Sequence, residues 1–305
     1  MPSEFEIIRR YFSRPARNAL LGVGDDAALL EPAPGMVLAV STDMLLEGRH
    51  FAPGAAPRAI GHKSLAVNLS DMAATGATPR WATLAIALPA ADEAWIAAFA
   101  EGFYELAERF GVDLVGGDTT RGALTVCVAI LGEVPVGLAL TRGGARPGDD
   151  IWVSGELGGA AFALEHPADA AAAKRLHEPE PRVALGERLR GLASAAIDIS
   201  DGFAQDLGHV LERSGVGAVA HYDRLPKHGI GDPALERRCV LAGGDDYELV
   251  FTAPQSARAA IEGLSQRLRL ALTRVGSIQP GEAKLQVLDA HGMPMSVSRG
   301  FDHFA

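Results

Sequence analysis

The sequence predicts an α/β or α+β chain built from two domains. Strand-like apolar runs interleave with helical patterns along its length, which is typical of chains that combine sheets with helices. Its 305 residues are enough for two domains of ordinary size. Residues 137–150 are rich in Gly, Pro and Arg and separate two strand-containing parts. We therefore expect an N-terminal domain over residues 1–137 and a C-terminal α/β domain over residues 138–305.

Six apolar runs are typical of strands, and three longer segments have the spacing of amphipathic helices. The expected strands span residues 36–41, 112–115, 124–134, 150–155, 194–199 and 247–254. The expected helices span residues 62–77, 92–111 and 201–215.

Glycines mark the ends of the three expected helices, at Gly76, Gly111 and Gly215. Asp201 is well placed to cap the N-terminus of the third helix. Apolar residues at helical spacing predict the buried faces: Leu65, Leu69, Met72 and Ala73 in the first helix, Trp95, Phe99, Leu106 and Phe110 in the second, and Phe203, Leu207, Val210 and Leu211 in the third.

Composition excludes several classes of protein. The net charge of −10 argues against a nucleic-acid partner, which favours a basic face. No apolar run reaches the roughly 18–20 residues that cross a bilayer, and the first residues lack the apolar region of a signal peptide. The two cysteines have no metal-binding spacing. We expect a cytoplasmic protein without a membrane partner.

Acidic residues stand where apolar runs end, and this pattern recurs along the chain. A buried charge without a partner is costly, so the position needs an explanation. The clusters are "GVGDDA" at 22–27, "STD" at 41–43, "VGGDTT" at 115–120, "AIDISDG" at 196–202 and "GGDD" at 243–246, with Asp71 inside an expected helix.

Each cluster alone has an ordinary explanation. Residues 22–27 fit part of the dinucleotide-binding fingerprint, but Pro32 and Pro34 exclude the helix that must follow, which leaves a solvated turn or a metal-binding turn. Residues 41–43 also fit a strand-end turn, and Asp71 fits a solvated helix face. No P-loop is present. Asp149 and Asp150 follow Pro-Gly before a strand, so we assign that pair to turn structure.

Five such clusters in one chain favour a shared role. Carboxylates beside hydroxyls are hard oxygen ligands, which suit Mg²⁺ better than zinc. We therefore interpret the acids as holding metal ions against phosphates. A non-catalytic acidic domain that binds Ca²⁺ or nucleotide is the alternative from another class, although the chain has no EF-hand loop.

Taken together, these motifs closely resemble those of the thiamine-monophosphate kinase family. The motifs are "GVGDDAALL", "STDMLLEGRHF", "AVNLSDMAATGA", "GGDTTRG", "LTRGGARPGDDIWVSG", "AIDISDG", "GGDDYELVF" and the terminal "GFDHF", in family order from residue 22 to 304. The family belongs to the aminoimidazole ribonucleotide synthetase-like superfamily. A sister enzyme with another acceptor is the second alternative.

The resemblance implies a fold, an activity and a set of partners. It implies the two-domain fold of the superfamily, with an N-terminal sheet domain that binds metal and ATP and forms a homodimer, and a C-terminal domain that completes the active site. It implies ATP-dependent phosphorylation of thiamine monophosphate to thiamine diphosphate with several Mg²⁺ ions, in thiamine diphosphate biosynthesis.

Carried over motif by motif, the resemblance also implies roles for particular residues. The implied magnesium ligands are Asp26, Ser41, Thr42, Asp43, Asp71, Asp118, Asp198 and Asp201. The implied ATP contacts are Tyr104, Gly117, Asp118, Arg142 and Ser200, and the implied thiamine-phosphate contacts are His50, Asp245 and Phe301. Ala242 and Phe301 depart from the family, which often has Ser at the first position and Trp or Tyr at the second.

The implied chemistry needs no general base. A phosphate acceptor, with a second pKa of about 6, is already largely ionised at neutral pH. We therefore expect direct in-line transfer without a phosphorylated enzyme, and no catalytic residue in the acid–base sense.

Overall fold

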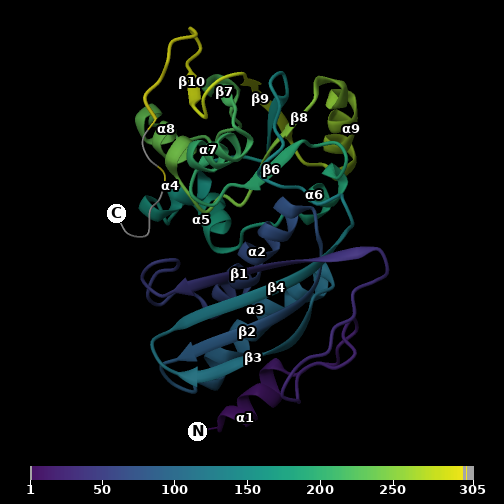
Figure 1. Ribbon diagram of the computed structural model, residues 1–305. Coiled ribbons are helices and arrows are strands. Elements are labelled where there is room, and N and C mark those ends of the chain that lie inside the picture. Colours follow the sequence, from purple (N-terminus) through teal and green to yellow (C-terminus); the bar gives the residue numbers. More distant parts are fainter. Residues whose placement is uncertain (1, 298–299, 301–305) are drawn as a thin grey trace. The chain divides into compact units, whose positions relative to one another are not determined.

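The computed structural model describes residues 2–297 and Gly300, and the chain divides into two compact units (Figure 1). The first unit comprises the described residues up to Met72 together with Ala77–Gly137. The second comprises Ala73–Gly76 and the described residues from Leu138 onward.

The first unit is a four-stranded sheet with two long helices. The sheet has the strand order β1-β4-β2-β3, in which β1 and β2 both pair antiparallel with β4, and β3 pairs parallel with β2. The elements are α1 (Glu4–Ile7), the π-helical turn η1 (Ile8–Phe12), β1 (Met36–Leu46), α2 (Pro57–Thr75), β2 (Thr78–Leu88), α3 (Glu93–Phe110), β3 (Asp113–Arg121) and β4 (Thr125–Pro135).

The inner strand β2 has no counterpart among the expected strands. Its alanines have low strand propensity, and Pro79 stands near its start. The period-two signal was nevertheless present, because Ala82, Leu84, Ile86 and Leu88 are buried in alternation. Its place between β4 and β3 satisfies the backbone groups on both sides.

Helices α2 and α3 cross at close range because two glycines lie at the crossing. A Cβ on Gly61 would lie 2.0 Å from the Phe99 carbonyl oxygen, and a Cβ on Gly102 would lie 1.9 Å from the Arg58 carbonyl oxygen. Asp92 caps the start of α3 by accepting from the backbone N–H groups of Ala94 and Trp95, and the helix ends as expected at Gly111.

The two faces of β1 differ in exposure. Val40 and Met44 on one face are 63% and 53% exposed, and Leu38 and Leu46 on that face are also exposed. Leu45 on the opposite face is buried, and Ser41 and Asp43 beside it are partly buried. The sheet therefore keeps an apolar surface along β1 uncovered within one chain.

The second unit is built on a six-stranded mixed sheet with the strand order β10-β7-β9-β5-β8-β6, in which β10 and β7 pair in parallel and the other neighbours are antiparallel. Its strands are β5 (Asp150–Ser154), β6 (Ala195–Asp198), β7 (Gly217–His221), β8 (Leu249–Ala253), β9 (Leu272–Gln279) and β10 (Leu285–Leu288). Its helices are α4 (Gly159–Glu165), α5 (Ala170–His177), α6 (Val183–Leu189), α7 (Phe203–Ser214), α8 (Pro233–Ala242) and α9 (Arg258–Leu268), with short 3₁₀ turns η2 (Tyr222–Arg224) and η3 (Gln255–Ala257).

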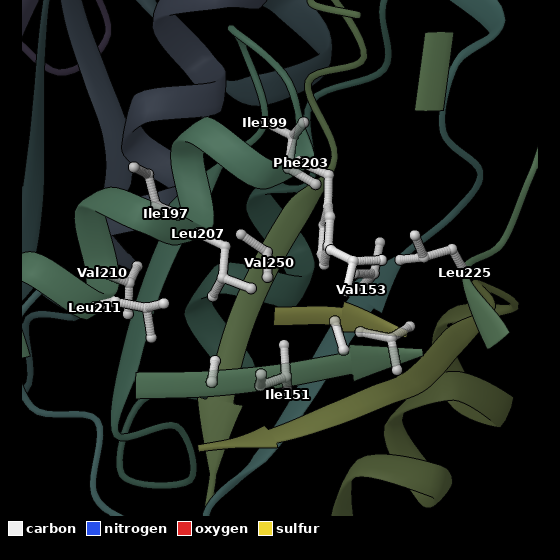
Figure 2. Close-up of a cluster of buried hydrophobic side chains, with 14 of the residues drawn as sticks. Ile151, Val153, Ile197, Ile199, Phe203, Leu207, Val210, Leu211, Leu225 and Val250 are labelled. Atoms are coloured by element: carbon white, nitrogen blue, oxygen red, sulfur yellow. The ribbon is translucent and has the colours of Figure 1, made fainter. Parts of the chain in front are cut away.

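Helix α7 packs across this sheet to form the core of the second unit. Phe203 and Leu207 of α7 point toward Val153 and Val250 on the strands (Figure 2). Both α7 residues are fully buried, as the helical spacing predicted. The strands β5, β6 and β8 of this core match expected strands, whereas β7, β9 and β10 and the helices other than α7 were not anticipated.

Among the described residues, no helix combines the length and apolar character that crossing a bilayer requires.

The helix crossing generates a stability prediction. We expect Gly102→Ala to lower the free energy of unfolding by about 3 kcal/mol, because the new methyl group must displace the Arg58 carbonyl. Gly208→Ala in α7 is the matched control, since its new methyl group would meet no neighbouring segment within 4 Å. That control should stabilise the chain by about 0.5–1 kcal/mol through helix propensity. Urea unfolding followed by circular dichroism checks both, and equal effects would contradict the close crossing.

Candidate active site

Strand β1 and helix α2 bring two of the expected ligands into contact. The hydroxyl of Ser41 donates a hydrogen bond to the Asp71 carboxylate, with 2.5 Å between Oγ and Oδ2. Because side chains alternate along a strand, Asp43 lies on the same face as Ser41, whereas Thr42 is exposed on the opposite face with Val40 and Met44. The expected set 41–43 is thus divided between the two faces of the sheet.

His50 follows β1 and is held by two hydrogen bonds. Its Nδ1 accepts from the backbone N–H of Leu46 at 2.9 Å, so the neutral ring carries its proton on Nε2. Its carbonyl oxygen accepts from the ammonium of Lys63 at 3.1 Å. Lys63 is only 3% exposed, and its burial in α2 is a feature that sequence reasoning missed.

A groove of 760 Å³ lies along the edge strand β3 of the first unit. Asp26, Gly117 and Asp118, three of the expected site residues, line it together with Asp25. Its apolar lining includes Phe5 and Phe12 from the N-terminal segment and Leu84, Leu114 and Val115 from the sheet, and Arg9 contributes a positive charge. An apolar wall beside a few convergent polar groups is typical of a small-molecule site.

Gly117 shapes this groove because no larger residue fits. Its backbone has a φ of 147°, which side chains rarely adopt, and a Cβ there would lie 1.8 Å from the Leu84 carbonyl oxygen. The neighbouring Asp118 is exposed. The "GGD" pattern therefore serves close backbone packing of β3 on β2 and presents the Asp118 carboxylate beside it.

Tyr104 is buried beneath the N-terminal segment. The guanidinium of Arg14 lies 3.5 Å from the centroid of the Tyr104 ring, and the Tyr104 hydroxyl donates to the Phe12 carbonyl at 2.9 Å. Burial raises the pKa of Tyr104 to about 12, against the smaller opposing effect of Arg14. The ring is 4% exposed, so in this conformation the N-terminal segment covers the expected adenine contact.

The N-terminal segment is fastened by ionic contacts to α3 and the start of β3. Arg10 pairs with Glu93, and Arg14 pairs with Glu108. The buried carboxylate of Asp113 accepts from the backbone N–H groups of Arg17 and Asn18, at 2.6 Å and 2.5 Å. This attachment places Phe5, Arg9 and Phe12 along the groove, and sequence reasoning gave these residues no role.

The chemistry of the donors fits magnesium. Across residues 2–297 and Gly300, no three side chains of the Asp, Glu, His or Cys types form a group that could by itself hold a metal ion. Mg²⁺ commonly takes one or two carboxylates, and waters and substrate phosphates supply its remaining ligands. The Ser41–Asp71 pair and the acids of the groove are oxygen donors of this kind.

In the second unit, Asp198, Ser200 and Asp201 lie at and just beyond the end of β6. The turn that carries them is held by Asp206, whose Oδ2 accepts from the backbone N–H groups of Ser200, Asp201 and Gly202 at 3.0, 3.0 and 3.1 Å. Asp206 is 2% exposed, and burial, followed by repulsion from Asp198 and Asp201, raises its pKa to about 7.

The expected cap by Asp201 is wrong. Helix α7 begins after Gly202, and no side chain caps it there. Asp206 lies inside the helix, and its carboxylate accepts from the backbone N–H groups that precede the helix, as a capping side chain would. The spacing Asp201 to Asp206 was visible in the sequence, but a capping carboxylate usually precedes its helix.

Asp245 lies next to this turn. Its backbone N–H donates to the Ser200 carbonyl at 2.9 Å, so two expected contacts come together within the second unit. Arg142 is exposed and neighbours Thr141, whose carbonyl accepts from Ala196 of β6 at 3.0 Å. Phe301 lies outside the described residues.

Asp149 and Asp150 are structural, as expected. Asp149 accepts from the Arg146 backbone N–H and the Ser194 hydroxyl at 3.0 Å and 2.6 Å. Asp150 is paired with the Arg258 guanidinium through contacts of 2.5 Å and 2.8 Å.

Comparison with known proteins shows which family the chain belongs to. Residues 24–134 match the N-terminal domain of AIR synthase related proteins, and residues 146–287 match the C-terminal domain. A thiamine-monophosphate kinase from Escherichia coli O157:H7 is 42% identical over 322 aligned residues, which cover 99% of this chain and 98% of the relative. One from Bacillus subtilis (strain 168) is 32% identical, with 99% of each chain covered. The chain belongs to the thiamine-monophosphate kinase family. It is therefore an enzyme that transfers a phosphoryl group to a phosphate acceptor.

Solved structures of the thiamine-monophosphate kinase family agree with the fold. The crystal structure from Stenotrophomonas maltophilia K279a has a TM-score of 0.85 and 46% sequence identity, and the match covers 92% of this chain and 94% of that one. AaThiL complexed with AMPPCP and TMP has a TM-score of 0.76 and 30% identity, with 92% of each chain covered.

The turn after β6 generates a prediction for this family member. We expect Asp206→Ala to lower the free energy of unfolding by about 2–4 kcal/mol, because it leaves one buried and two partly buried amides without their acceptor. Asp201→Ala should change stability by less than about 0.5 kcal/mol, since Asp201 is not a cap. Urea titration of both variants checks this, and a cost from Asp201→Ala that matches the Asp206 cost would restore the capping role.

Proposed function

We propose that the protein phosphorylates thiamine monophosphate to thiamine diphosphate with ATP as phosphoryl donor, in thiamine diphosphate biosynthesis. The observation that carries this proposal is the match along the whole chain to thiamine-monophosphate kinases. The oxygen-donor motifs of the sequence, which resemble those of that family, agree with it. The AaThiL complex with an ATP analogue and TMP supports both substrates.

Transfer is direct and in line, with no phosphorylated enzyme. The acceptor phosphate is already largely ionised at neutral pH, since its second pKa is about 6. It therefore needs no proton acceptor, and the groove along β3 has no histidine among its lining residues. The main barrier is repulsion between an anionic acceptor and an anionic triphosphate.

Several Mg²⁺ ions would supply the positive charge that offsets the repulsion between the two phosphate groups. In the first unit, Asp26, Asp43, Asp71 and Asp118 would supply carboxylate oxygens for them, and Ser41 would supply a hydroxyl. The side chain of Thr42 lies on the opposite face of β1 and is not part of this set. In the second unit, Asp198 and Asp201 would supply carboxylate oxygens from a turn that Asp206 holds. Two hydrogen-bonded arrangements support these side chains: Ser41 donates to Asp71, and Asp206 holds the turn that carries Asp201.

The remaining residues contact the two substrates. Gly117 and Asp118 face the nucleotide phosphates along the groove, with Arg142 and Ser200 as further ATP contacts. Tyr104 would reach ATP only after the N-terminal segment that covers it moved aside. His50, Asp245 and Phe301 contact thiamine monophosphate. The Asp245 carboxylate is suited to the positively charged thiazolium ring or to the amino group of the pyrimidine.

The protein forms a homodimer through the open face of β1. Val40 and Met44 are exposed there beside Cys127 and Ala129 of β4, which lie on the same face of the sheet. An exposed apolar strip of this kind is typical of an interface, and a second copy of the same strip is self-complementary.

The reaction is tested by phosphorus NMR of the purified protein with Mg-ATP and thiamine monophosphate. We expect thiamine diphosphate and ADP in equal amounts, and no phosphorylated protein by mass spectrometry during turnover. Asp43→Asn and Asp71→Asn should each lower turnover by about 100-fold or more, because each removes a metal-binding charge. Asp92→Asn is the control and should retain activity, since Asn caps α3 as well as Asp does.

Two outcomes would contradict this proposal. A folded protein that binds Mg-ATP but leaves thiamine monophosphate unchanged would be a sister enzyme with another acceptor. Turnover at the wild-type level in Asp43→Asn or Asp71→Asn would remove that residue from the site.

The dimer is tested by sedimentation. The double variant Val40→Lys with Met44→Lys places like charges on the apolar face and should sediment as a monomer, whereas the wild type sediments as a dimer. A matched variant on another exposed apolar residue, Leu164→Lys in α4, should remain dimeric. A Val40/Met44 variant that stays dimeric would place the interface elsewhere.

A further inference from the structure

The loop between α8 and β8 holds two residues in an unfavourable backbone conformation. Asp245 has a φ of 67° and Tyr247 a φ of 49°, in the left-handed region that non-glycine residues rarely adopt. Strain of this kind persists only where the surrounding structure determines the conformation, and it is commonly found at functional sites.

One face of this loop is hydrogen-bonded to the segment that follows β6. The backbone N–H of Asp245 donates to the Ser200 carbonyl at 2.9 Å, and that of Tyr247 donates to the Ile199 carbonyl at 2.8 Å. The Ile199 N–H in turn donates to the Glu248 carbonyl at 2.8 Å. The Tyr247 hydroxyl donates to Oδ1 of Asp245 at 3.1 Å, so the tyrosine orients that carboxylate.

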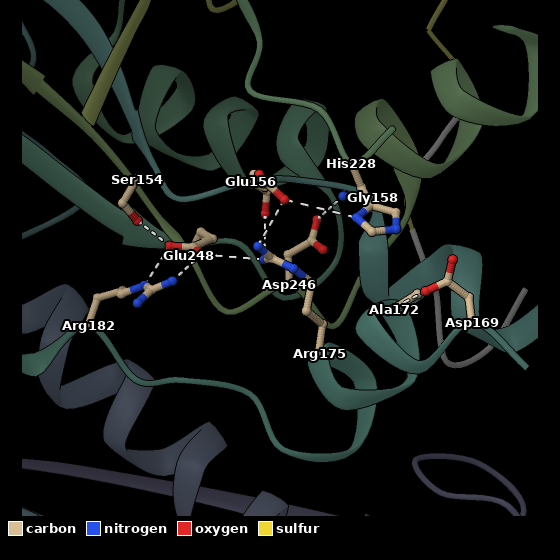
Figure 3. A network of polar contacts seen from close by, with 10 residues as sticks. All are labelled: Ser154, Glu156, Gly158, Asp169, Ala172, Arg175, Arg182, His228, Asp246 and Glu248. Atoms are coloured by element: carbon tan, nitrogen blue, oxygen red, sulfur yellow. Dashed lines mark hydrogen bonds and ion pairs between the residues drawn. The ribbon is translucent and has the colours of Figure 1, made fainter. Parts of the chain in front are cut away.

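Asp246 and Glu248 alternate with Asp245 and Tyr247 along the loop. Their side chains lie on the buried side of the loop and are 7% and 1% exposed. Oδ2 of Asp246 accepts from the Gly158 backbone N–H at 2.8 Å. Burial raises the pKa of Asp246 to about 8, so placing this group here opposes its ionisation. Figure 3 shows both side chains directed into one polar network.

Glu248 is the centre of that network. Its Oε2 accepts from the Ser154 hydroxyl at 2.6 Å and from Nε of Arg182 at 2.7 Å, while its Oε1 accepts from a terminal nitrogen of Arg182 at 2.5 Å. This two-pronged contact fixes the plane of the carboxylate. Arg175 lies 3.8 Å from Oε1 and links Glu248 to Glu156 (Figure 3).

The chain leaves space for this carboxylate at Gly155. A Cβ on Gly155 would lie 1.9 Å from Oε1 of Glu248, and the φ of Gly155 is 57°. The adjacent Ser154 hydroxyl also accepts from the Leu249 backbone N–H at 2.9 Å. Ser154 therefore donates a hydrogen bond to the Glu248 side chain, and Gly155 leaves the space that this side chain occupies.

We propose that Glu248 and Arg182 are positioning residues for Asp245: their buried ion pair anchors the strained loop so that the Asp245 carboxylate is held beside Ser200 in the orientation that binds the substrate. The proposal rests on the proposed function, in which Asp245 contacts thiamine monophosphate. Asp246 is a second anchor on the same side of the loop. Neither anchor touches the substrate.

The same sheet offers a matched control for Glu248. Asp150 is a buried carboxylate, 3% exposed, that accepts from Nε and one terminal nitrogen of the Arg258 guanidinium at 2.5 Å and 2.8 Å. It pairs with Ala253, at the end of β8 that lies away from the loop. Glu248→Gln and Asp150→Asn therefore both remove a buried charge from an arginine, but only the first loosens the loop.

The experiment measures thiamine monophosphate KM, Mg-ATP KM and kcat, together with hydrogen–deuterium exchange of the amides of Asp245 and Tyr247. We expect Glu248→Gln to raise the thiamine monophosphate KM about 10-fold or more and to speed both amides about 10-fold, a loss near 1.4 kcal/mol. Asp150→Asn should leave KM and both amides within about twofold of wild type.

Arg182→Lys covers the case in which Glu248→Gln does not fold. It keeps the positive charge but cannot make the two-pronged contact, so it should reproduce both effects in weaker form. The proposal is overturned if the folded variant of Glu248 or Arg182 matches Asp150→Asn in KM and in amide exchange. Failure of the proposed function is a separate result: a wild type without thiamine monophosphate kinase activity would refute that function, while the exchange data would still decide whether the ion pair anchors the loop.

Discussion

A carboxylate that is buried in a protein needs several hydrogen-bond donors around it, and this requirement organises both units. Asp206 gathers three backbone amides, and Glu248 gathers a hydroxyl and both prongs of an arginine. Asp113 does the same for the N-terminal segment, through the amides of Arg17 and Asn18. Each of these acids fixes a segment that has no regular hydrogen-bond ladder of its own. Some of the acids therefore have a structural role, and the hydrogen bonds that they accept offset the cost of removing them from water.

This division explains why the acids of one motif have different roles. In "AIDISDGFAQD", Asp201 lies in the turn, whereas Asp206 lies beneath it and holds it. In "GGDDYE", Asp245 lies beside Ser200, whereas its neighbour Asp246 points into the interior. Sequence spacing shows that an acid is present but does not show which way it points in an irregular segment, because no fixed period applies there. The expected cap by Asp201 failed for this reason.

The elements that sequence predicted well are those with a strong period and a chemical stop. Helix α3 begins after Asp92 and ends before Gly111, and α7 ends before Gly215, because caps and left-handed glycines act locally. Strand β2 was missed because its alternation is carried partly by alanine, and its burial comes from neighbours distant in sequence. The covering of Tyr104 by Arg14 was equally unpredictable, since it depends on a contact between an irregular segment and a helix far from it in the sequence. The motifs supplied the candidate residues, whereas tertiary packing decided the accessibility of each side chain.

The acids that line the groove of the first unit differ from the buried acids, because other acids lie near them instead of several hydrogen-bond donors. Asp25, Asp26 and Asp118 line one cavity, where Arg9 supplies positive charge. Like charges about 4 Å apart in a hydrated site repel by roughly 1 kcal/mol, and more as water is excluded. Under the proposed function, a bound divalent cation would offset that repulsion. The fold must then keep these acids along the same groove. The close packing of Gly117 on β2 and the ionic attachment of the N-terminal segment meet that demand, because both fix the walls of the groove through contacts that do not involve its acids.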